Sequence, residues 1–186
     1  MGLGLSAASG FRIFIPFMML SILPLSGIDI SASGPAFFST DIYAIIFLIL
    51  SVTEVILYYN PWMDNMLDLI STPVSIFSGI MLSYLALSGA EFYLRLIISV
   101  VLGGGISLNI QLLTVKARSL TSIFKKGNGN KIVSTIENIS SLLISILSLI
   151  YPILSVLTLA IIIFLIYKFI IKKGYKAENR NFLKMS

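Results

Sequence analysis

The sequence contains no cysteine and no histidine among its 186 residues. Without these side chains the protein cannot form disulfides, the usual zinc sites, or Ser-His-Asp and Cys-His catalytic groups. Charged residues are also scarce, at 11% of the sequence compared with about a quarter in soluble domains. A soluble globular domain is therefore not expected, and a disordered chain is excluded. We expect no cofactor, no metal site and no catalytic residues of these kinds.

Hydrophobic residues are abundant instead, at 57% of the sequence with a mean hydropathy of +1.00. A helix that crosses a bilayer needs about 20 mostly apolar residues. The apolar runs of this sequence cover residues 3–23, 42–59, 74–87, 92–115, 132–150 and 153–171. We predict an all-α polytopic transmembrane helix bundle of about six spans. It forms a single domain over residues 1–171, followed by a basic tail over residues 172–186.

A short segment between the second and third runs has a different pattern. Asn60-Pro61 is typical of a helix start. The residues from Trp62 to Ile70 then place apolar side chains on one face, and polar ones on the other. Pro73 separates this segment from the next run. We expect a short interfacial or re-entrant helix here.

The basic residues predict the orientation in the membrane. Of the 13 lysines and arginines, five lie between Lys116 and Lys131 and six between Lys168 and Lys184. Two basic clusters separated by two spans lie on one side, which the positive-inside rule assigns to the cytoplasm. Counting six spans puts both termini in the cytoplasm of a multi-pass cell-membrane protein. The expected partners are membrane lipids, with anionic headgroups near the basic loop and tail, and not nucleic acid; a homo-oligomer remains open.

Small residues at helical spacing indicate which faces point inward. The fifth run carries Ser141 and Ser145 among further serines on one face, and we expect both to face a neighbouring helix. Packing alone explains such a stripe, and a polar path through the bundle is the alternative. The two halves, 1–88 and 91–171, also share short motifs in the same order, which allows two inverted three-helix repeats. Chance similarity between serine-rich helices explains the same motifs equally well.

Ionisable residues within the spans are the candidates for function, because an intramembrane charge costs about 2.5 to 3.5 kcal/mol on insertion scales. Arg12 lies midway along an apolar run, and we expect it to pair with Glu54 or Glu137. Ser134 and Glu137 also match a helix-capping pattern, which would place Glu137 near a solvated helix end. The full set of intramembrane charge and binding candidates is Arg12, Glu54, Glu137, Asn138, Lys116 and Arg118.

Asp64 and Asp68 form a secondary acidic pair, one turn apart on the short segment. Two carboxylates at this spacing could hold a divalent cation through oxygen ligands. They are also what a solvated helix face would carry. No other donors converge on them in the sequence, so an enzyme is the least favoured class of function.

The sequence resembles an uncharacterised prokaryotic integral membrane family, the domain of unknown function 4126, over about residues 3 to 155. The resemblance rests on motifs in a fixed order: Gly4 to Arg12 with Pro16, Glu54, Asn60 to Asp64, Pro73 with Gly79, Lys116 to Arg118, Asn130, Ser134 to Asn138, and Pro152. The sequence lacks the family's histidine before Lys116, and Glu137-Asn138 replaces the usual Glu-Asp pair. The resemblance implies a membrane location and no known activity.

Two further classes of function remain open beside the enzyme. A small transporter, channel or lipid-translocating protein would explain the intramembrane charges and the proline and glycine breaks. An anion or a lipid headgroup would suit Arg12 and the helix N-termini. A non-catalytic membrane scaffold or accessory subunit would need only the packing stripes and the basic tail.

Overall fold

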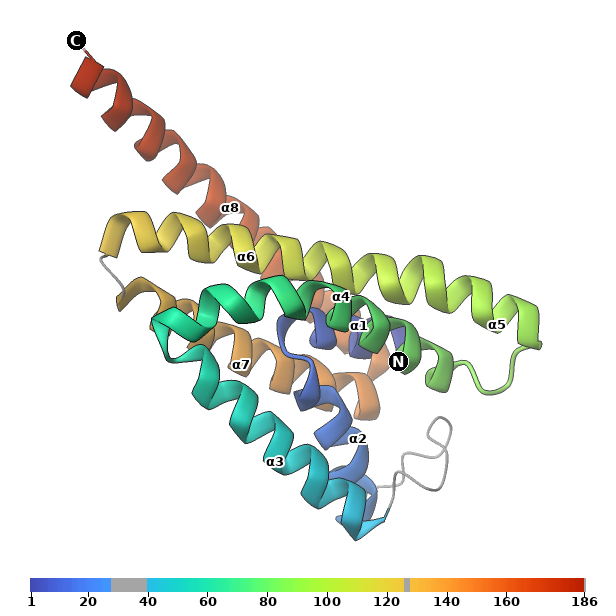
Figure 1. The fold of residues 1–186 in the computed structure, drawn as a ribbon. Helices are drawn as coiled ribbons and strands as arrows, with labels where there is room; N and C mark the ends of the chain where they lie inside the picture. Colours follow the sequence, from blue (N-terminus) through green and yellow to red (C-terminus); the bar gives the residue numbers. More distant parts are fainter. Residues whose placement is uncertain (28–39, 126–127, 186) are drawn as a thin grey trace.

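The computed structural model describes residues 1–27, 40–125 and 128–185, with side chains described except at 61–62, 64–65, 122–125, 128–130 and 172–185. These residues form helices and no strand (Figure 1). The elements are α1 (Gly2–Phe11), α2 (Phe14–Leu25), α3 (Asp41–Tyr58), α4 (Pro61–Ala86), α5 (Phe92–Ile98), the π-helix η2 (Ser99–Gly104), α6 (Gly105–Lys125), α7 (Asn128–Ile150) and α8 (Pro152–Met185).

Five stretches of these helices are long and apolar enough to cross a membrane: Asp41–Tyr58, Met66–Ala86, Phe92–Thr121, Lys131–Ile150 and Pro152–Ile171. Their outward faces carry large exposed apolar side chains, as expected of surfaces that contact lipid. The prediction of an all-α membrane helix bundle is therefore confirmed. One of the expected runs, residues 3–23, is absent from this set.

That first apolar run is a pair of short helices, and not a single span. Arg12 has an extended backbone, with φ −145° and ψ 130°, and this residue separates α1 from α2. Leu5 of α1 packs in one apolar cluster with Phe17 and Leu20 of α2. The two helices therefore run antiparallel and form a hairpin with Arg12 at its tip (Figure 1). Each is only 10 or 12 residues long, about half the length needed for a span.

The hairpin changes the position of the N-terminus. A Cβ on Gly2 would lie 3.1 Å from the Cβ of Ala86, at the end of α4. From that end of the bundle α8 runs to the opposite end, so the two chain termini lie at opposite ends (Figure 1). The six-span count placed both termini on one side. The structure differs because the first run enters the bundle and returns.

The helix α4 is longer than the sequence predicted. It begins at Pro61, as the Asn60-Pro61 pattern indicated, and continues through Pro73 to Ala86. The short amphipathic segment is thus the first part of a long helix, and not a separate interfacial or re-entrant piece. Proline is tolerated here because neighbouring groups in a membrane bundle satisfy the freed backbone atoms. Pro73 has no amide hydrogen, so the carbonyl that loses its helical partner is that of Leu69, one turn earlier.

Glycines allow α4 and η2 to approach each other closely. A Cβ on Gly103 would lie 2.6 Å from the Gly79 carbonyl oxygen, and a Cβ on Gly79 would lie 2.6 Å from the Gly103 carbonyl oxygen. The π-helical turn directs Gly103 and Gly104 toward α4 without ending the helix. The fourth run therefore continues through α6 to Lys125, well beyond Lys116, where the sequence suggested an end.

The helix α1 lies in the centre of the bundle, in contact with α4, α6 and α7 (Figure 1). Its residues from Gly4 to Phe11 are all buried. The Ser141 hydroxyl of α7 donates to the Ala8 carbonyl at 2.9 Å, and Ser141 and Ser145 are both 0% exposed. The expectation that these serines face a neighbouring helix is confirmed. Within the described helices the α1–α2 break has no counterpart in the second half, so the inverted repeat stays a prediction.

Candidate functional site

Arg12, at the tip of the hairpin, is almost completely buried, with 1% of its surface exposed. Its Nη2 lies 3.0 Å from Glu137 Oε2 and 2.5 Å from the Ser134 hydroxyl. Its Nε donates to Asn138 Oδ1 at 2.5 Å. The extended backbone at Arg12 directs this side chain to the first half of α7. Of the two partners expected for Arg12, the structure shows Glu137.

Tyr58 lies between the two buried arginines. Its ring centroid is 3.8 Å from the Arg12 Cζ and 4.4 Å from the Arg118 Cζ. The Tyr58 hydroxyl is 2.6 Å from the Ser71 hydroxyl. An aromatic face stabilises a nearby cation, and the effect increases when water is excluded. Tyr58 therefore helps to hold two guanidinium groups near each other inside the bundle.

Glu54 has a different role from the one the sequence suggested. Its two carboxylate oxygens accept hydrogen bonds from the backbone amides of Ile13 and Phe14, at 2.9 and 3.0 Å. These amides open α2 and have no partner within their own helix, because the first amides of any helix lack one. The N-terminal end of a helix also carries partial positive charge. Glu54 of α3 therefore caps the helix that begins at the break.

Glu137 and Arg118 form a second ion pair beside the first. Arg118 Nε and Nη2 donate to the two oxygens of Glu137 at 2.9 and 2.6 Å, a bidentate geometry. Arg118 Nη1 also contacts Asp68 Oδ1 at 2.5 Å. Glu137 is 2% exposed and Arg118 is 3% exposed. Glu137 thus bridges Arg12 and Arg118, and its position within α7, which begins at Asn128, excludes the helix-cap interpretation.

We define the charge cluster as Arg12, Glu54, Asp68, Arg118 and Glu137. It joins the hairpin tip to α3, α4, α6 and α7. Glu137 and Asp68 form ion pairs with the two guanidinium groups, and Glu54 accepts hydrogen bonds from the two amides that follow Arg12. Each member holds at least one ion pair or charge-assisted hydrogen bond, which offsets the cost of burial. Two described polar atoms at or near the cluster are buried without a hydrogen-bond partner: Arg12 Nη1 and Ser51 Oγ.

Most of the predicted site residues meet in this cluster, but not all do. Asn138 contacts Arg12, and Asp68 contacts Arg118, so Asp68 is an ion-pair partner here and not a solvated helix charge. Lys116 is exposed and points away from the cluster. The side chain of Asp64 lies outside the described residues. Among the described side chains, no group of three or more Asp or Glu could hold a metal ion.

Neither the contact of Tyr58 with the two arginines nor the capping role of Glu54 was predicted from the sequence. Tyr58 is one helical turn after Glu54, so the shared face was visible. Its contact with two arginines depends on how α3 packs against the hairpin tip and α6, which no local pattern encodes. The capping role was hidden because Ile13 and Phe14 carry none of the usual helix-start residues.

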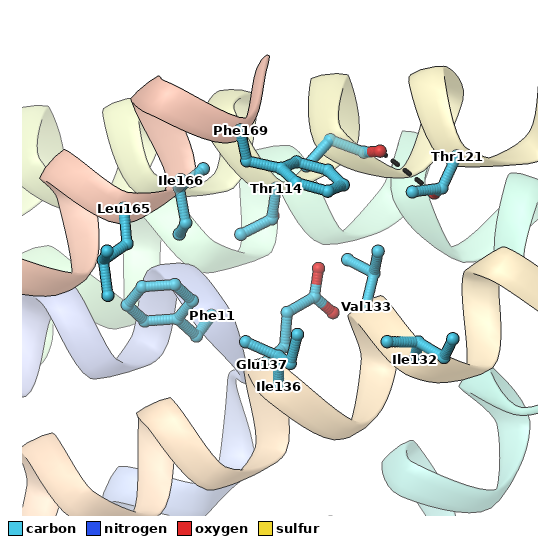
Figure 2. A pocket seen from close by; sticks show the side chains of 11 residues that line it. Phe11, Thr114, Thr121, Ile132, Val133, Ile136, Glu137, Leu165, Ile166 and Phe169 are labelled. Carbon is cyan, nitrogen blue, oxygen red and sulfur yellow. Dashed lines mark hydrogen bonds between the residues drawn. The ribbon is translucent and has the colours of Figure 1, made fainter. Parts of the chain in front are cut away.

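Glu137 also lines a pocket of about 410 Å³ between α6, α7 and α8. In Figure 2 its carboxylate rises from α7 into the middle of that space, with Phe11 on one side and Val133 on the other. The remaining lining is mainly apolar. The charge cluster therefore adjoins an apolar pocket, and Glu137 belongs to both.

The fold and the site together define a polytopic helical membrane protein with buried ionisable side chains at a helix break. The model of a family described as a domain of unknown function (DUF4126) matches residues 1–172, so the chain belongs to that family, as the motifs indicated. No curated protein and no solved structure matches the chain.

Proposed function

We propose that this protein is a small membrane transporter or lipid-translocating protein that binds an anionic group at the tip of the α1–α2 hairpin. The observation that carries this proposal is the buried charge cluster at the break between two short helices. Secondary transporters commonly place their substrate site where discontinuous helices end inside the membrane. Ionisable side chains at such depth are costly, and they commonly mark substrate or ion pathways.

The chemistry of the cluster favours an anion. The Arg12 guanidinium and the opening amides of α2 are donors that bind carboxylates and phosphates well. Glu137 and Glu54, two carboxylates of the protein itself, occupy these donors. A free anion or a lipid headgroup would compete for the same positions. Binding would then require one glutamate to move or to take up a proton.

We further propose that the end of the bundle where α6 meets α7 faces the cytoplasm of the cell membrane. The basic residues of segment 116–131 and of the C-terminal tail support this orientation through the positive-inside rule. Arg118 belongs to the buried cluster, so four basic residues of that segment remain to support it. The hairpin then enters from the opposite face, with Arg12 nearer the cytoplasmic end.

Reconstitution of the full chain in liposomes tests this proposal. We would measure efflux of inorganic phosphate and of acetate, and the exchange of fluorescent phosphatidylglycerol between leaflets. At least one of these activities is expected. It should fall about tenfold or more in Glu54→Gln, because an amide cannot take up and release a proton as the glutamate can.

The matched control is Glu91→Gln, which makes the same chemical change at an exposed residue. It should retain the wild-type rate. Equal rates in the Glu54 and Glu91 variants would exclude the cluster as the site. A well-folded wild-type protein that moves none of the three probes would favour the alternative, a membrane scaffold or accessory subunit.

A further inference from the structure

The pocket between α6, α7 and α8 is apolar over most of its wall. Its lining includes Phe11, Ala117, Ile136, Leu165 and Phe169, with Glu137 as the charged member (Figure 2). Both oxygens of Glu137 already accept hydrogen bonds from Arg118. The two threonines of the wall donate their hydroxyls to backbone carbonyls of α6. The pocket therefore offers little hydrogen bonding to water and suits a hydrocarbon.

The outer side of this pocket faces the membrane. Leu165 is 58% exposed and Ile136 is 50% exposed. The helix α8 is the least buried of the five candidate spans, and its C-terminal part leans away from the bundle (Figure 1). A space that opens sideways between membrane helices is accessible to lipid tails without passage through water. The chain of a neighbouring lipid can therefore enter it directly.

One basic residue lies beside the pocket lining. Lys168 of α8 is exposed, directly precedes Phe169 and shares a helix face with Leu165, three residues earlier. Basic groups beside a pocket between membrane helices are typical of sites for anionic headgroups. The basic group at the rim suits an anionic headgroup, and the apolar wall suits an acyl chain of the same lipid.

We propose that this pocket binds an anionic phospholipid, with one acyl chain against Ile136, Leu165 and Phe169 and the headgroup at Lys168. This inference goes beyond the proposed function, since the lipid would bind whether or not the protein transports anything. The bound chain would lie against Glu137, the residue that pairs with Arg12. It would thereby shield the charge cluster from water on the α8 side.

Native mass spectrometry of the full chain tests the proposal. The protein would be titrated with dioleoylphosphatidylglycerol and, separately, with dioleoylphosphatidylcholine. One phosphatidylglycerol per chain should remain bound, in clear preference to phosphatidylcholine. Replacement of the rim lysine, Lys168→Gln, should weaken phosphatidylglycerol binding about fivefold, as expected for one basic residue near a lipid surface. Arg95→Gln, a charge change away from this pocket, should leave the preference unchanged.

A second variant tests the acyl-chain part separately. Ala117→Leu should fill part of the pocket and reduce the binding of both lipids, whereas Lys168→Gln keeps the wall intact. Equal binding of the two lipids, or unchanged phosphatidylglycerol binding in Lys168→Gln, would overturn the proposal. So would a dimer that carries no lipid, because it would identify a second copy of this chain as the occupant.

Discussion

Arg12 cannot lose its charge inside the membrane, because arginine remains protonated in any protein environment. Glutamate can become neutral by taking up a proton. Replacing the glutamate should therefore destabilise the fold more than replacing the arginine. Glu137 neutralises two arginines, with contacts of 3.0 Å to Arg12 and 2.6 Å to Arg118. Removing it would break the ion pair of Arg12 and the bidentate pair of Arg118.

We therefore expect Glu137→Leu to lower the free energy of unfolding by about 3–5 kcal/mol, the usual cost of breaking a buried pair. The double variant Arg12→Leu/Glu137→Leu should recover much of that loss, because it removes the charge left unpaired at Arg12. Chemical unfolding in detergent micelles measures the free energy of unfolding of the single and the double variant, with Glu91→Leu as the exposed control. Strict additivity of the two single replacements would show that the pair contributes no coupling.

Glu54 gives a second prediction at the scale of single residues. In Glu54→Ala the amides of Ile13 and Phe14 lose their acceptor, so the start of α2 should loosen. The expected cost is about 0.5–2 kcal/mol, as for the loss of other N-terminal caps. Hydrogen exchange at these two amides should accelerate, while exchange in α7 should change much less. Unchanged protection at both amides would mean that Glu54 is not needed as a cap.

At the scale of helices, hydropathy predicted the long elements well, because a span needs a long apolar run and little else. It could not predict that the first run breaks at Arg12. The break depends on Glu54 and Glu137, which come from α3 and α7 and which stabilise an extended residue that the local sequence does not favour. Pro73 led to the opposite error. The sequence predicted that a short helix ends there, whereas α4 continues through Pro73 to Ala86.

The close contact between α4 and η2 can be tested with two neighbouring glycines. Gly103→Ala should destabilise the bundle, because the new Cβ would lie 2.6 Å from both the Gly79 carbonyl oxygen and the Ser83 Cβ. Gly105→Ala is the matched control, since nothing lies within 4 Å of a Cβ there. It should be neutral, or stabilising by up to about 1 kcal/mol through helix propensity. Equal unfolding midpoints for the two variants would contradict the packing described here.

At the scale of the whole molecule, the hairpin predicts a topology with the two termini on opposite sides of the membrane. A tag joined to Met1 by a linker should be accessible from the same side as a cysteine at Gly89, in the loop after α4. A cysteine at Lys131 should label from the other side. Residues 89 and 131 are both exposed, and nothing lies within 4 Å of a Cβ added at Gly89. Labelling of the Met1 tag from the Lys131 side would instead support a six-span chain.

The residues of the candidate site were largely predictable, whereas their arrangement was not. Charges in apolar runs stand out in any sequence, which is why Arg12, Glu54 and Glu137 were identified. The bidentate pair between Arg118 and Glu137 and the contact from Asp68 depend on the packing of α4, α6 and α7. Such contacts join residues 19 to 50 positions apart in the sequence, and a sequence pattern carries no information about them.

We propose that the charge cluster serves the movement of an anionic group and does not act in folding alone. Liposome transport by the double variant Arg12→Leu/Glu137→Leu tests this, measured with the same three probes as the wild-type protein. Well-packed apolar residues can replace a buried ion pair with little loss of stability, and Arg118 keeps its contact with Asp68, so we predict a folded bundle that has lost the activity. A folded double variant that transports at the wild-type rate would show that the pair is not required for transport.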